Sequence, residues 1–384
     1  MAPDDLYSFM CSDEGQNLRR QTELSGVDKM MLKYSGKSSF PFKEVIQQWH
    51  LRKKASKKFP HLLKNNPHWL FPDAVIIEQA TAELIANERF KECKFNNSAD
   101  LTAGLGIDFY SMLNQSEQSL YVDANETRVQ YAKWNFKEKK NVNVVYGKAE
   151  VAWRGQSFDL VFLDPDRRSN GKRTFLPDDS TPNLNQLLPE ISPFAGEVWV
   201  KLSPMVDVVG LRRLYPNAHI RVWSLADEVK EITLHIGNNQ SGYAASILSN
   251  TGKRFDWFPK DNGSRLLATE VEDFIYYPDA AIRKLQMWDA MCGEYGVKML
   301  DVNTNVFTSN VFLGDFPGKV WKTIHVSKPG DRNLIDVEGM HVLRKNYPQT
   351  VAQLRKRYRI REGSTLLLAC KVAGKNQWIT GESV

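Results

Sequence analysis

The sequence has little of the residues that build disulfide frameworks and metal centres. Its 384 residues include only four cysteines, Cys11, Cys93, Cys292 and Cys370, and no two of them form a C-x-x-C pair. Its seven histidines are scattered, without the spacing of metal ligands. We therefore expect reduced thiols, no structural zinc and no bound metal.

Long hydrophobic runs are also missing. No apolar stretch approaches the roughly 18 residues of a membrane-spanning helix, and the N-terminus lacks the basic-then-apolar pattern of a signal peptide. Internal repeats and low-complexity tracts are absent as well. These absences predict a soluble, cytoplasmic protein, and the length predicts more than one domain.

The most informative motif is a glycine turn at residues 100–108, D-L-T-A-G-L-G-I-D. Gly104 and Gly106 let the backbone turn tightly and approach a ligand without a Cβ in the way. The full G-x-G-x-x-G spacing is absent, because Phe109 holds the third position. These residues alone fit a site for NAD, FAD or S-adenosylmethionine, and they also fit a simple tight loop.

Short apolar runs follow the glycine turn and alternate with helical patterns. We expect strands over 119–122, 142–146, 158–163 and 197–202, each ending in a polar cluster. This pattern predicts a mostly parallel, doubly wound α/β sheet that is buried on both faces. In open α/β sheets, binding sites lie at the carboxyl ends of the strands. Asp123 follows one of the expected strands, where its carboxylate is placed to accept hydrogen bonds from ribose hydroxyls.

With these motifs, the chain resembles the class I S-adenosylmethionine-dependent methyltransferases. Residues 100–108 are similar to the cofactor loop of bacterial ribosomal RNA guanine-N2 methyltransferases. The whole chain resembles more closely a bacterial family in which a methyltransferase core carries a C-terminal THUMP-like domain. The residues that carry this resemblance are 48–60, 78–80, 100–108, 163–168 and 344–348. It implies a Rossmann-like core, an N-terminal helical region and a C-terminal α+β region of ferredoxin-like or THUMP-like type.

The resemblance assigns a pocket for S-adenosylmethionine. Gly104 and Gly106 would lie against its methionine part, with Asp100 or a backbone carbonyl at the ammonium. Asp123 would bind the ribose hydroxyls, and residues 148–149 would flank the adenine. The expected cofactor-binding residues are Asp100, Thr102, Ala103, Gly104, Gly106, Asp108, Asp123, Ala124, Asn125, Lys148, Ala149 and Asp164.

The turn after the 158–163 strand is expected to carry the chemistry, through Asp164, Asp166 and Arg167. In amino-methylating relatives this turn reads Asp/Asn-Pro-Pro followed by an aromatic residue that stacks on the base. Methyl transfer is an in-line displacement, so holding the target amine in line supplies much of the acceleration. Here Asp166 replaces the second proline and Arg167 the aromatic residue, and a guanidinium plane can stack on a base or pair with phosphate. The alternative is a solvated turn in which Arg167 and Arg168 pair with Asp166.

Residues at the ends of the neighbouring strands bear on the other possible methylation reactions. Carbon methylation of pyrimidines needs a cysteine nucleophile, and the tip at 202–204 reads Leu-Ser-Pro, so direct transfer to nitrogen or oxygen is expected. Ribose 2′-O-methylation is the second enzymatic hypothesis, with Asp164 and Lys201 handling the proton and Glu228 or Glu231 assisting. A non-catalytic RNA-binding protein that kept the fold is the competing class.

Positive charge gathers in two segments of a chain with net charge +6. Residues 41–64 hold seven Lys or Arg and one Glu, and residues 341–361 hold seven Lys or Arg and no acid. Such segments indicate phosphate binding, and the interleaved Trp49, His50, Phe59, Tyr347 and Tyr358 offer stacking surfaces for bases. We therefore expect structured RNA (tRNA or rRNA) as the partner, the alternative being solvated helix faces. The expected RNA contacts are Arg52, Lys53, Lys54, Lys57, Lys58, Arg168, Lys201, Arg344, Lys345, Arg355, Lys356 and Arg357.

Four regions follow from these patterns. They are a helical domain at 1–72, the methyltransferase core at 73–252, a ferredoxin-like region at 253–318 and a THUMP-like RNA-binding region at 319–384. Single helices are expected over 74–92 and 279–295. The loop at 170–185 is expected to be a substrate lid or an insertion.

Overall fold

The computed structural model describes residues 2–35, 42–166, 168–169, 172–173, 180–237, 241–260, 263–335 and 339–384. The chain divides into two compact units, the first formed by residues 1–219 and 232–241 and the second by 220–231 and 242–384. This division is coarser than the four regions expected from the sequence, whose boundaries stay a prediction. Arg167 and most of the expected lid loop lie outside the described residues.

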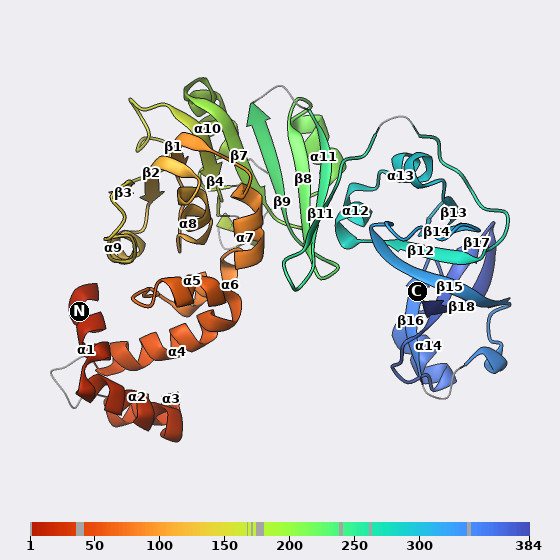
Figure 1. Cartoon of the computed structure of the whole chain (residues 1–384), viewed down its shortest axis with the longest axis horizontal. Coiled ribbons are helices and arrows are strands. Elements are labelled where there is room, and N and C mark those ends of the chain that lie inside the picture. Colours follow the sequence, from red (N-terminus) through yellow and green to blue (C-terminus); the bar gives the residue numbers. More distant parts are fainter. Residues whose placement is uncertain are drawn as a thin grey trace. The chain divides into compact units, whose positions relative to one another are not determined.

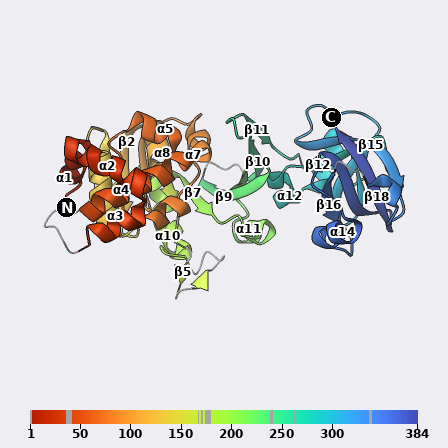
Figure 2. The same cartoon turned by 90° about the horizontal axis from the view of Figure 1, so that it is seen from below.

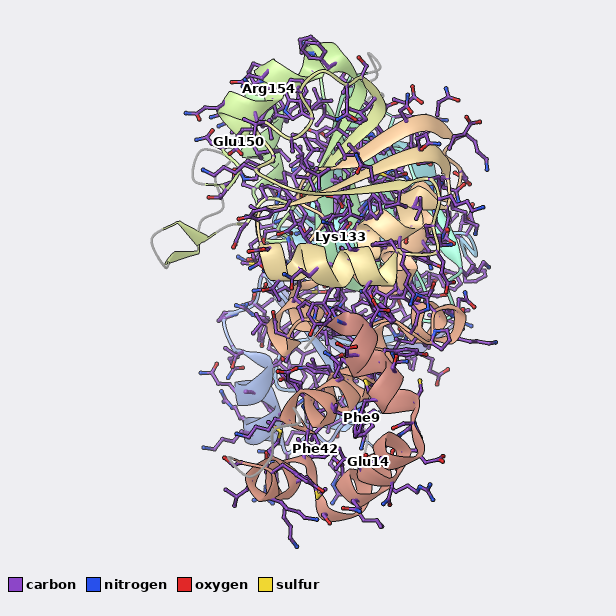
Figure 3. All side chains as sticks on the ribbon, turned by 90° about the vertical axis from the view of Figure 1, so that its left-hand side faces the viewer. Phe9, Glu14, Phe42, Lys133, Glu150 and Arg154 are labelled. Atoms are coloured by element: carbon purple, nitrogen blue, oxygen red, sulfur yellow. The ribbon has the colours of Figure 1, made fainter. Side chains whose placement is uncertain are left out.

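The first unit begins with a cluster of short helices (Figure 2). They are α1 (Pro3–Cys11), α2 (Asp13–Ser25), α3 (Val27–Lys33), α4 (Phe42–Lys58) and α5 (Pro60–Asn65). The apolar faces of α1 to α4 pack together and against Trp134. Phe9 and Phe42, labelled in Figure 3, meet edge to face with ring centres 5.8 Å apart. Leu24 lies on α2 outside this core and is 88% exposed.

A mostly parallel sheet forms the centre of the first unit (Figure 1). Six of the nine strands of this sheet stand in the order β9-β7-β4-β1-β2-β3, and among these six only β9 is antiparallel to its neighbour β7. The strands are β1 (Phe95–Asp100), β2 (Ser116–Asp123), β3 (Val142–Tyr146), β4 (Phe158–Leu163), β7 (Ala195–Leu202) and β9 (Glu228–Gly237). The expected parallel sheet and its strands are confirmed.

Helices and two further strands complete the first unit. They are α6 (Ala74–Gln79), α7 (Glu83–Phe90), α8 (Ile107–Leu113), α9 (Glu126–Asn135), β5 (Arg168–Ser169), β6 (Lys172–Arg173), α10 (Leu184–Ile191), η2 (Ser192–Phe194) and α11 (Val208–Leu214). Aromatic rings fill the space between helices and sheet, as where Phe109 meets Tyr121 with ring centres 5.4 Å apart. Burial of such large rings is a main source of folding free energy in a core of this kind.

Strand β1 is more polar than a buried strand usually is. Its first residues are Phe95, Asn96 and Asn97, and Ser98 follows at a fully buried position. The hydroxyl of Ser98 bonds to those of Ser116 and Ser119, at 2.8 and 2.9 Å. Because these hydroxyls satisfy one another, Ser98 can be buried with its hydroxyl paired, while Asn96 and Asn97 are exposed.

The single helix expected over 74–92 is two helices, α6 and α7. Ala80 has an extended backbone with ψ of 153°, and Ala82, the N-cap of α7, has ψ of 132°. Thr81 lies between them and turns its hydroxyl to Asp108 instead of to a helical carbonyl, at 2.6 Å. The hydrophobic periodicity continues through this break, and the periodicity alone could not reveal it.

The second unit contains β8 (His219–Leu225), β10 (Gly242–Leu248) and β11 (Arg254–Trp257), followed by a seven-stranded sheet of order β13-β14-β12-β15-β18-β17-β16. The strands of that sheet are β12 (Phe274–Pro278), β13 (Lys298–Asp301), β14 (Thr304–Ser309), β15 (Gly318–Ser327), β16 (Met340–Lys345), β17 (Thr365–Val372) and β18 (Lys375–Ser383). The helices are α12 (Ala280–Leu285), α13 (Trp288–Tyr295), η3 (Arg332–Leu334) and α14 (Val351–Tyr358). The helix expected over 279–295 is interrupted, because Gln286 adopts a left-handed conformation with φ of 58°.

Side chains in and beside the basic helix α14 pack and pair within their own unit, which the sequence did not indicate. Tyr347 is buried, and Tyr358 packs edge to face on Trp378, with ring centres 4.8 Å apart. Arg355 pairs with Glu362 at 2.7 Å. The two tyrosines therefore cover the sheet, which explains why they interleave with basic residues.

Two findings concern other classes of protein. In the part of the chain that the structure describes, no helix has both the length and the apolar character needed to cross a membrane. Nor do the described His, Cys, Asp and Glu side chains gather into a group that could hold a metal ion.

Candidate active site

A cavity of about 420 Å³ opens at the carboxyl ends of β1, β4 and β7 in the first unit. Its volume falls within the range of about 300–1,000 Å³ that is typical of small-molecule sites. Its walls are formed by the end of α6, the glycine turn, the Asp-Pro turn after β4, residues 203–205 after β7, and Arg128 of α9. The predicted residues that line it are Asp100, Thr102, Ala103, Gly104, Gly106, Asp108, Asp164 and Asp166.

The glycine turn is held in place from strand β2. Gly104 has φ of 55° and Gly106 φ of 81°, which are left-handed conformations that favour glycine. The N–H of Gly104 donates to the Asp123 carboxylate at 2.9 Å, and the hydroxyl of Tyr121 donates to the Gly104 carbonyl at 2.6 Å. A Cβ on Gly106 would lie 3.1 Å from the ring of Phe136. Both glycines line the cavity, but a side chain at Gly106 would enter the packed core, whereas one at Gly104 would not.

The residues predicted for the ribose and adenine do not line this cavity. Asp123 is buried, and its carboxylate also accepts a hydrogen bond from the N–H of Asn125 at 2.7 Å. Ala124, Asn125 and Lys148 are exposed, and Ala149 is buried. The cavity therefore corresponds to the part of the site predicted for the methionine end, and the other contacts stay predictions.

The cavity is acidic. Four of its lining residues are aspartates, and Arg128 is the cation among its lining residues. Burial raises the pKa of Asp100 well above its ordinary value, and the negative charges of Asp108 and Asp164 add to this effect. Thr102 and Lys201 act in the opposite direction, through a backbone hydrogen bond and a positive charge. A cationic ligand group would relieve this accumulation of negative charge.

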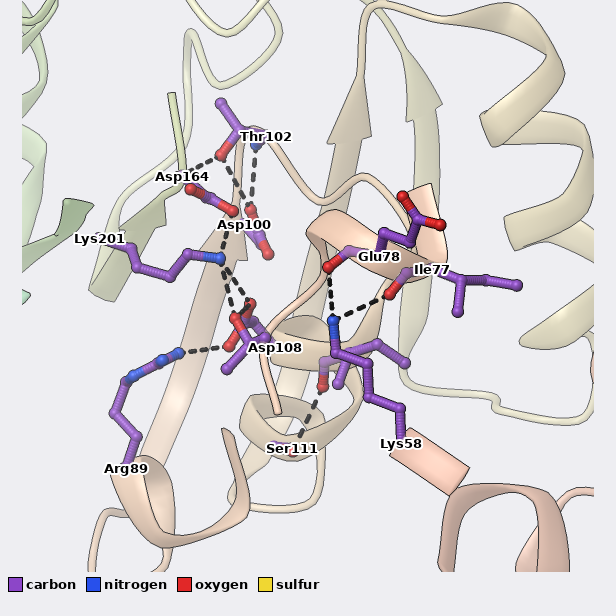
Figure 4. A network of polar contacts seen from close by, with 12 residues as sticks. Lys58, Ile77, Glu78, Arg89, Asp100, Thr102, Asp108, Ser111, Asp164 and Lys201 are labelled. Carbon is purple, nitrogen blue, oxygen red and sulfur yellow. Dashed lines mark hydrogen bonds and ion pairs between the residues drawn. The ribbon is translucent and has the colours of Figure 1, made fainter. Parts of the chain in front are cut away.

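Lys201 connects the acidic residues behind the cavity wall (Figure 4). Its ammonium pairs with the Asp164 carboxylate, donates to the Thr81 hydroxyl at 2.8 Å and lies 3.5 Å from Asp108. The backbone N–H of Asp164 in turn donates to the Thr102 hydroxyl at 2.6 Å. Both the backbone and the side chain of Asp164 are thus fixed by hydrogen bonds.

Asp108 is a buried member of this network, held by two cations. Its carboxylate pairs with Arg89, whose side chain is fully buried and lies over the ring of Phe162 at 5.0 Å. Burial alone would raise the pKa of Asp108, but Arg89 and Lys201 outweigh burial and lower the pKa below its ordinary value. Asp108 therefore holds a lasting negative charge between two cations.

Asp166, another predicted catalytic residue, lines the cavity. Asp166 is exposed and forms a two-way backbone bridge with Thr181, with both N–H to O distances at 2.9 Å. This bridge brings the end of the expected lid loop back to the Asp-Pro turn. Arg167 and the side chain of Arg168 lie outside the described residues.

Two features correct or extend the sequence interpretation. Lys201, expected to contact RNA, is buried with its ammonium engaged in the network, so it offers no surface to a large partner. Thr81 and Arg89 were not expected in the site, and Met205, 68% exposed, was not expected at its edge. Because Thr81 directly follows the family segment 78–80, that segment is the signal that could have pointed to it.

Part of the first basic segment is structural. Lys54 pairs with Glu78, and Lys58 donates to the carbonyls of Ile77 and Glu78 at 2.9 and 2.7 Å. These bonds satisfy carbonyl groups at the end of α6, which would otherwise lack partners. Lys53 and Lys57 are exposed. Two of the lysines expected to contact RNA thus support the α6 wall of the cavity.

Comparison with known proteins agrees with this geometry. A solved structure from Porphyromonas gingivalis W83, described as that of a methyltransferase, matches with a TM-score of 0.82 at 21% identity, covering 95% of this chain and 96% of that one. The chain has the fold of a methyltransferase. Two Mycobacterium tuberculosis proteins, from strains CDC 1551 / Oshkosh and H37Rv, are named as uncharacterised S-adenosylmethionine-dependent methyltransferases. Each is 28% identical over 262 residues, which is 67% of this chain and 71% of the relative.

The second unit has its own match. A family model described as a ferredoxin-like domain matches residues 274–317, which run from β12 into the segment before β15. The methyltransferase resemblance and the ferredoxin-like region recognised in the sequence are thus confirmed.

Proposed function

We propose that the chain is an S-adenosylmethionine-dependent methyltransferase that methylates a base nitrogen in structured RNA, either tRNA or rRNA. The observation that carries this proposal is the cavity in which the glycine turn faces the Asp-Pro turn across the carboxyl ends of β1 and β4. The fold and the names of the M. tuberculosis relatives support the same cofactor and reaction.

The residues present fit this cofactor. S-adenosylmethionine carries a sulfonium and an ammonium, and four aspartates line the cavity, which makes it a favourable place for such cations. The position of a Cβ on Gly104 has no heavy atom nearer than 3.8 Å, so the backbone there is open to close approach by a ligand. Asp100, at the end of β1, is placed to meet the ammonium.

The cofactor supplies an activated methyl group, and the protein supplies alignment. Asp164, fixed by Thr102 and Lys201, can accept a hydrogen bond from the target amine and direct its lone pair. Its carboxylate also stabilises the positive charge that develops on the nitrogen as the new bond forms. The exposed Asp166 extends the same acidic edge toward the substrate.

An RNA substrate is supported by the exposed part of the basic segments. Lys53 and Lys57 in the first unit, and Arg344, Lys356 and Arg357 in the second, are exposed to solvent. Such side chains bind phosphates without regard to sequence, which suits a large anionic substrate.

Ribose 2′-O-methylation is a second candidate, favoured by one observation. Lys201 contacts Asp164, as a pair that handles the proton of a hydroxyl would. The buried ammonium of Lys201 also bonds to Thr81 and lies 3.5 Å from Asp108, and Lys201 is not among the residues that line the cavity. Because its ammonium is engaged behind the cavity wall, base methylation is the primary proposal.

The test compares RNA modification profiles of cells that have and lack the protein. Complementation uses wild type, Asp164→Ala, and Asp28→Ala as a control that removes an exposed carboxylate that does not line the cavity. We expect one methylated base to vanish without the protein and to return with wild type and the control but not with Asp164→Ala. A ribose methylation that behaves this way would select the second candidate.

Calorimetry with S-adenosylhomocysteine tests the cofactor separately. Absence of binding to the wild-type protein would contradict the enzymatic proposal and leave the non-catalytic RNA-binding protein. Localisation in the cytoplasm stays a prediction, which a tagged full-length chain would check by fractionation.

A further inference from the structure

A second cavity of about 940 Å³ lies among the N-terminal helices of the first unit. It is walled by α1, α2 and α4, the cluster seen in Figure 2, and by the residues around α5. None of the residues that line the active-site cavity lines this one. It is therefore a separate site in the same unit.

One face of α4 supplies the wall with chemically distinct groups. Trp49, Arg52, Lys53 and Ser56 all line the cavity. Their spacing of three, four and seven residues puts them on one side of a helix. The face thus presents an aromatic ring, a guanidinium, an ammonium and a hydroxyl to the same space.

The cations of this wall exceed its acids. Arg19 pairs with Glu23 at 3.0 Å, which accounts for the acidic residue among those lining the cavity. Arg52 donates to the carbonyl of Trp69, and among the described residues no carboxylate pairs with it. Burial, together with the like charge of Arg19, lowers the pKa of Arg52 below its ordinary value. A half-buried guanidinium with only a neutral partner is a favourable place for an anion.

Aromatic groups adjoin these cations. Trp49 is partly buried against the helical core but also lines the cavity, as does Tyr7 across from it on α1. Tyr7 is itself fixed by its contact with Trp134, at a ring-centre distance of 5.6 Å. A flat ring next to a positive charge is how proteins bind nucleotides of single-stranded RNA, the base stacking and the phosphate pairing.

We propose that this cavity binds a nucleotide of the RNA substrate other than the one that is methylated, with its phosphate at Arg52 and Lys53 and its base on Trp49. The proposal rests on the proposed RNA substrate. An acidic peptide would pair with the cations, but it would not use the ring of Trp49 or most of the volume of the cavity.

The same helix connects this site to the reaction. On another side of α4, Lys54 and Lys58 hold the end of α6, and α6 contributes Ile76 and Gln79 to the wall of the active-site cavity. A nucleotide anchored on α4 would therefore be bound to the element that also shapes the active site.

The test measures the affinity of the full-length protein for a fluorescein-labelled single-stranded RNA of about ten nucleotides, by fluorescence anisotropy at several salt concentrations. The variants are Trp49→Leu, Arg52→Gln and Lys53→Gln. Lys133→Gln is the control, since Lys133 is an exposed lysine on helix α9 of the same unit that lines neither cavity. Thermal melting identifies any variant that fails to fold, and Arg52→Lys, which keeps the charge, replaces Arg52→Gln in that case.

We expect Trp49→Leu to weaken binding about fivefold or more, as removal of one stacked base does. Lys53→Gln should reduce the dependence on salt by about one phosphate contact, and Lys133→Gln should not. Equal effects of Lys53→Gln and Lys133→Gln, with no effect of Trp49→Leu, would overturn the proposal in favour of a general basic surface. Competition by a poly-glutamate peptide as strong as that by unlabelled RNA would overturn it in favour of an acidic protein partner.

The outcome is separable from that of the proposed function. If wild type binds RNA with this pattern but does not bind S-adenosylhomocysteine, the methyltransferase proposal fails and the nucleotide site stands. If it binds S-adenosylhomocysteine and its RNA affinity is the same in every variant, the nucleotide site fails and the methyltransferase proposal stands.

Discussion

Lys201 and Asp164 form an ion pair across the ends of two neighbouring parallel strands. Strands β4 and β7 pair with Leu163 opposite Val200, so the next residue of each strand lies beside the other at the edge of the sheet. The pair is therefore a direct result of strand register, and it gives the Asp-Pro turn a fixed carboxylate. Preorganised groups of this kind cost little reorganisation when a reaction develops charge.

Replacing Lys201 by methionine removes the cation from two carboxylates. We expect a loss of stability of about 1–3 kcal/mol, as for hydrogen bonds to charged groups. A fully buried pair would cost more, but the Asp164 side chain is 32% exposed and can be hydrated. Urea unfolding of Lys201→Met measures this loss.

The same variant distinguishes the two candidate reactions. If Lys201 only positions Asp164, Lys201→Arg restores much of the rate of methyl transfer and leaves affinity for S-adenosylhomocysteine unchanged. If Lys201 is a general base for a ribose hydroxyl, Lys201→Arg is as inactive as Lys201→Met, because a guanidinium does not give up its proton near neutral pH.

Asp108→Asn should destabilise the protein in a way that depends on pH. The pKa of Asp108 is lower in the folded chain than in the unfolded one, so its ion pairs stabilise the fold above about pH 4 and lose this effect as pH falls through the folded pKa. We expect a loss of about 3–5 kcal/mol at neutral pH, as when a buried pair loses one partner. The difference from wild type should shrink at about pH 3. A difference that is the same at both pH values would show that the charge of Asp108 is not what matters.

The sequence predicted those parts of the fold that local patterns determine. Apolar runs such as 158–163 and 197–202 are strands because β-branched and aromatic side chains fit a buried sheet, and the positions of β4 and β7 follow the prediction. The glycine turn was recognisable because few residues other than glycine accept its backbone angles.

The network behind the cavity depends instead on contacts between distant segments. Thr81 and Lys201 are 120 residues apart in the chain and bond at 2.8 Å. Neither residue belongs to a motif. From the sequence alone, a lysine near a strand end can be either a buried partner of such a network or a surface cation that binds RNA. Tyr347 and Tyr358 were predicted to offer stacking surfaces for bases for the same reason. Their actual packing partners on β17 and β18 come later in the chain.

Asp100→Asn should raise stability while weakening the cofactor site. Since burial raises the pKa of Asp100 in the folded chain, the folded state binds a proton more strongly than the unfolded state does. Stability therefore falls as pH rises above the unfolded pKa of about 4 and up to the folded pKa. Asparagine keeps the acceptor for the N–H of Thr102, 3.0 Å away, and avoids this loss.

We expect Asp100→Asn to melt at a higher temperature than wild type at neutral pH, by roughly 2–4 °C for each kcal/mol gained. Its affinity for S-adenosylmethionine should fall about tenfold or more, because the ammonium loses a charged partner. Calorimetry in buffers of different ionisation enthalpy should detect proton release when wild type binds the cofactor, and less with the variant. A variant that binds as tightly as wild type would remove Asp100 from the site.

Substituting alanine at each glycine of the turn distinguishes a loss of stability from a loss of cofactor affinity. Both positions have left-handed backbones, so either substitution costs about 1–2 kcal/mol in conformational strain. Gly106→Ala also places a methyl group 3.1 Å from the ring of Phe136, in a packed core that must shift to admit it. A methyl group on Gly104 meets no atom nearer than 3.8 Å and projects toward the cavity.

Gly106→Ala should therefore lose more stability in urea, and Gly104→Ala should lose more affinity for S-adenosylhomocysteine relative to its loss of stability. The comparison is internal, because both variants add one methyl group to the same turn. If the two variants lose stability and affinity in the same proportion, the turn acts only as a folding element, and the wall that contacts the cofactor lies elsewhere.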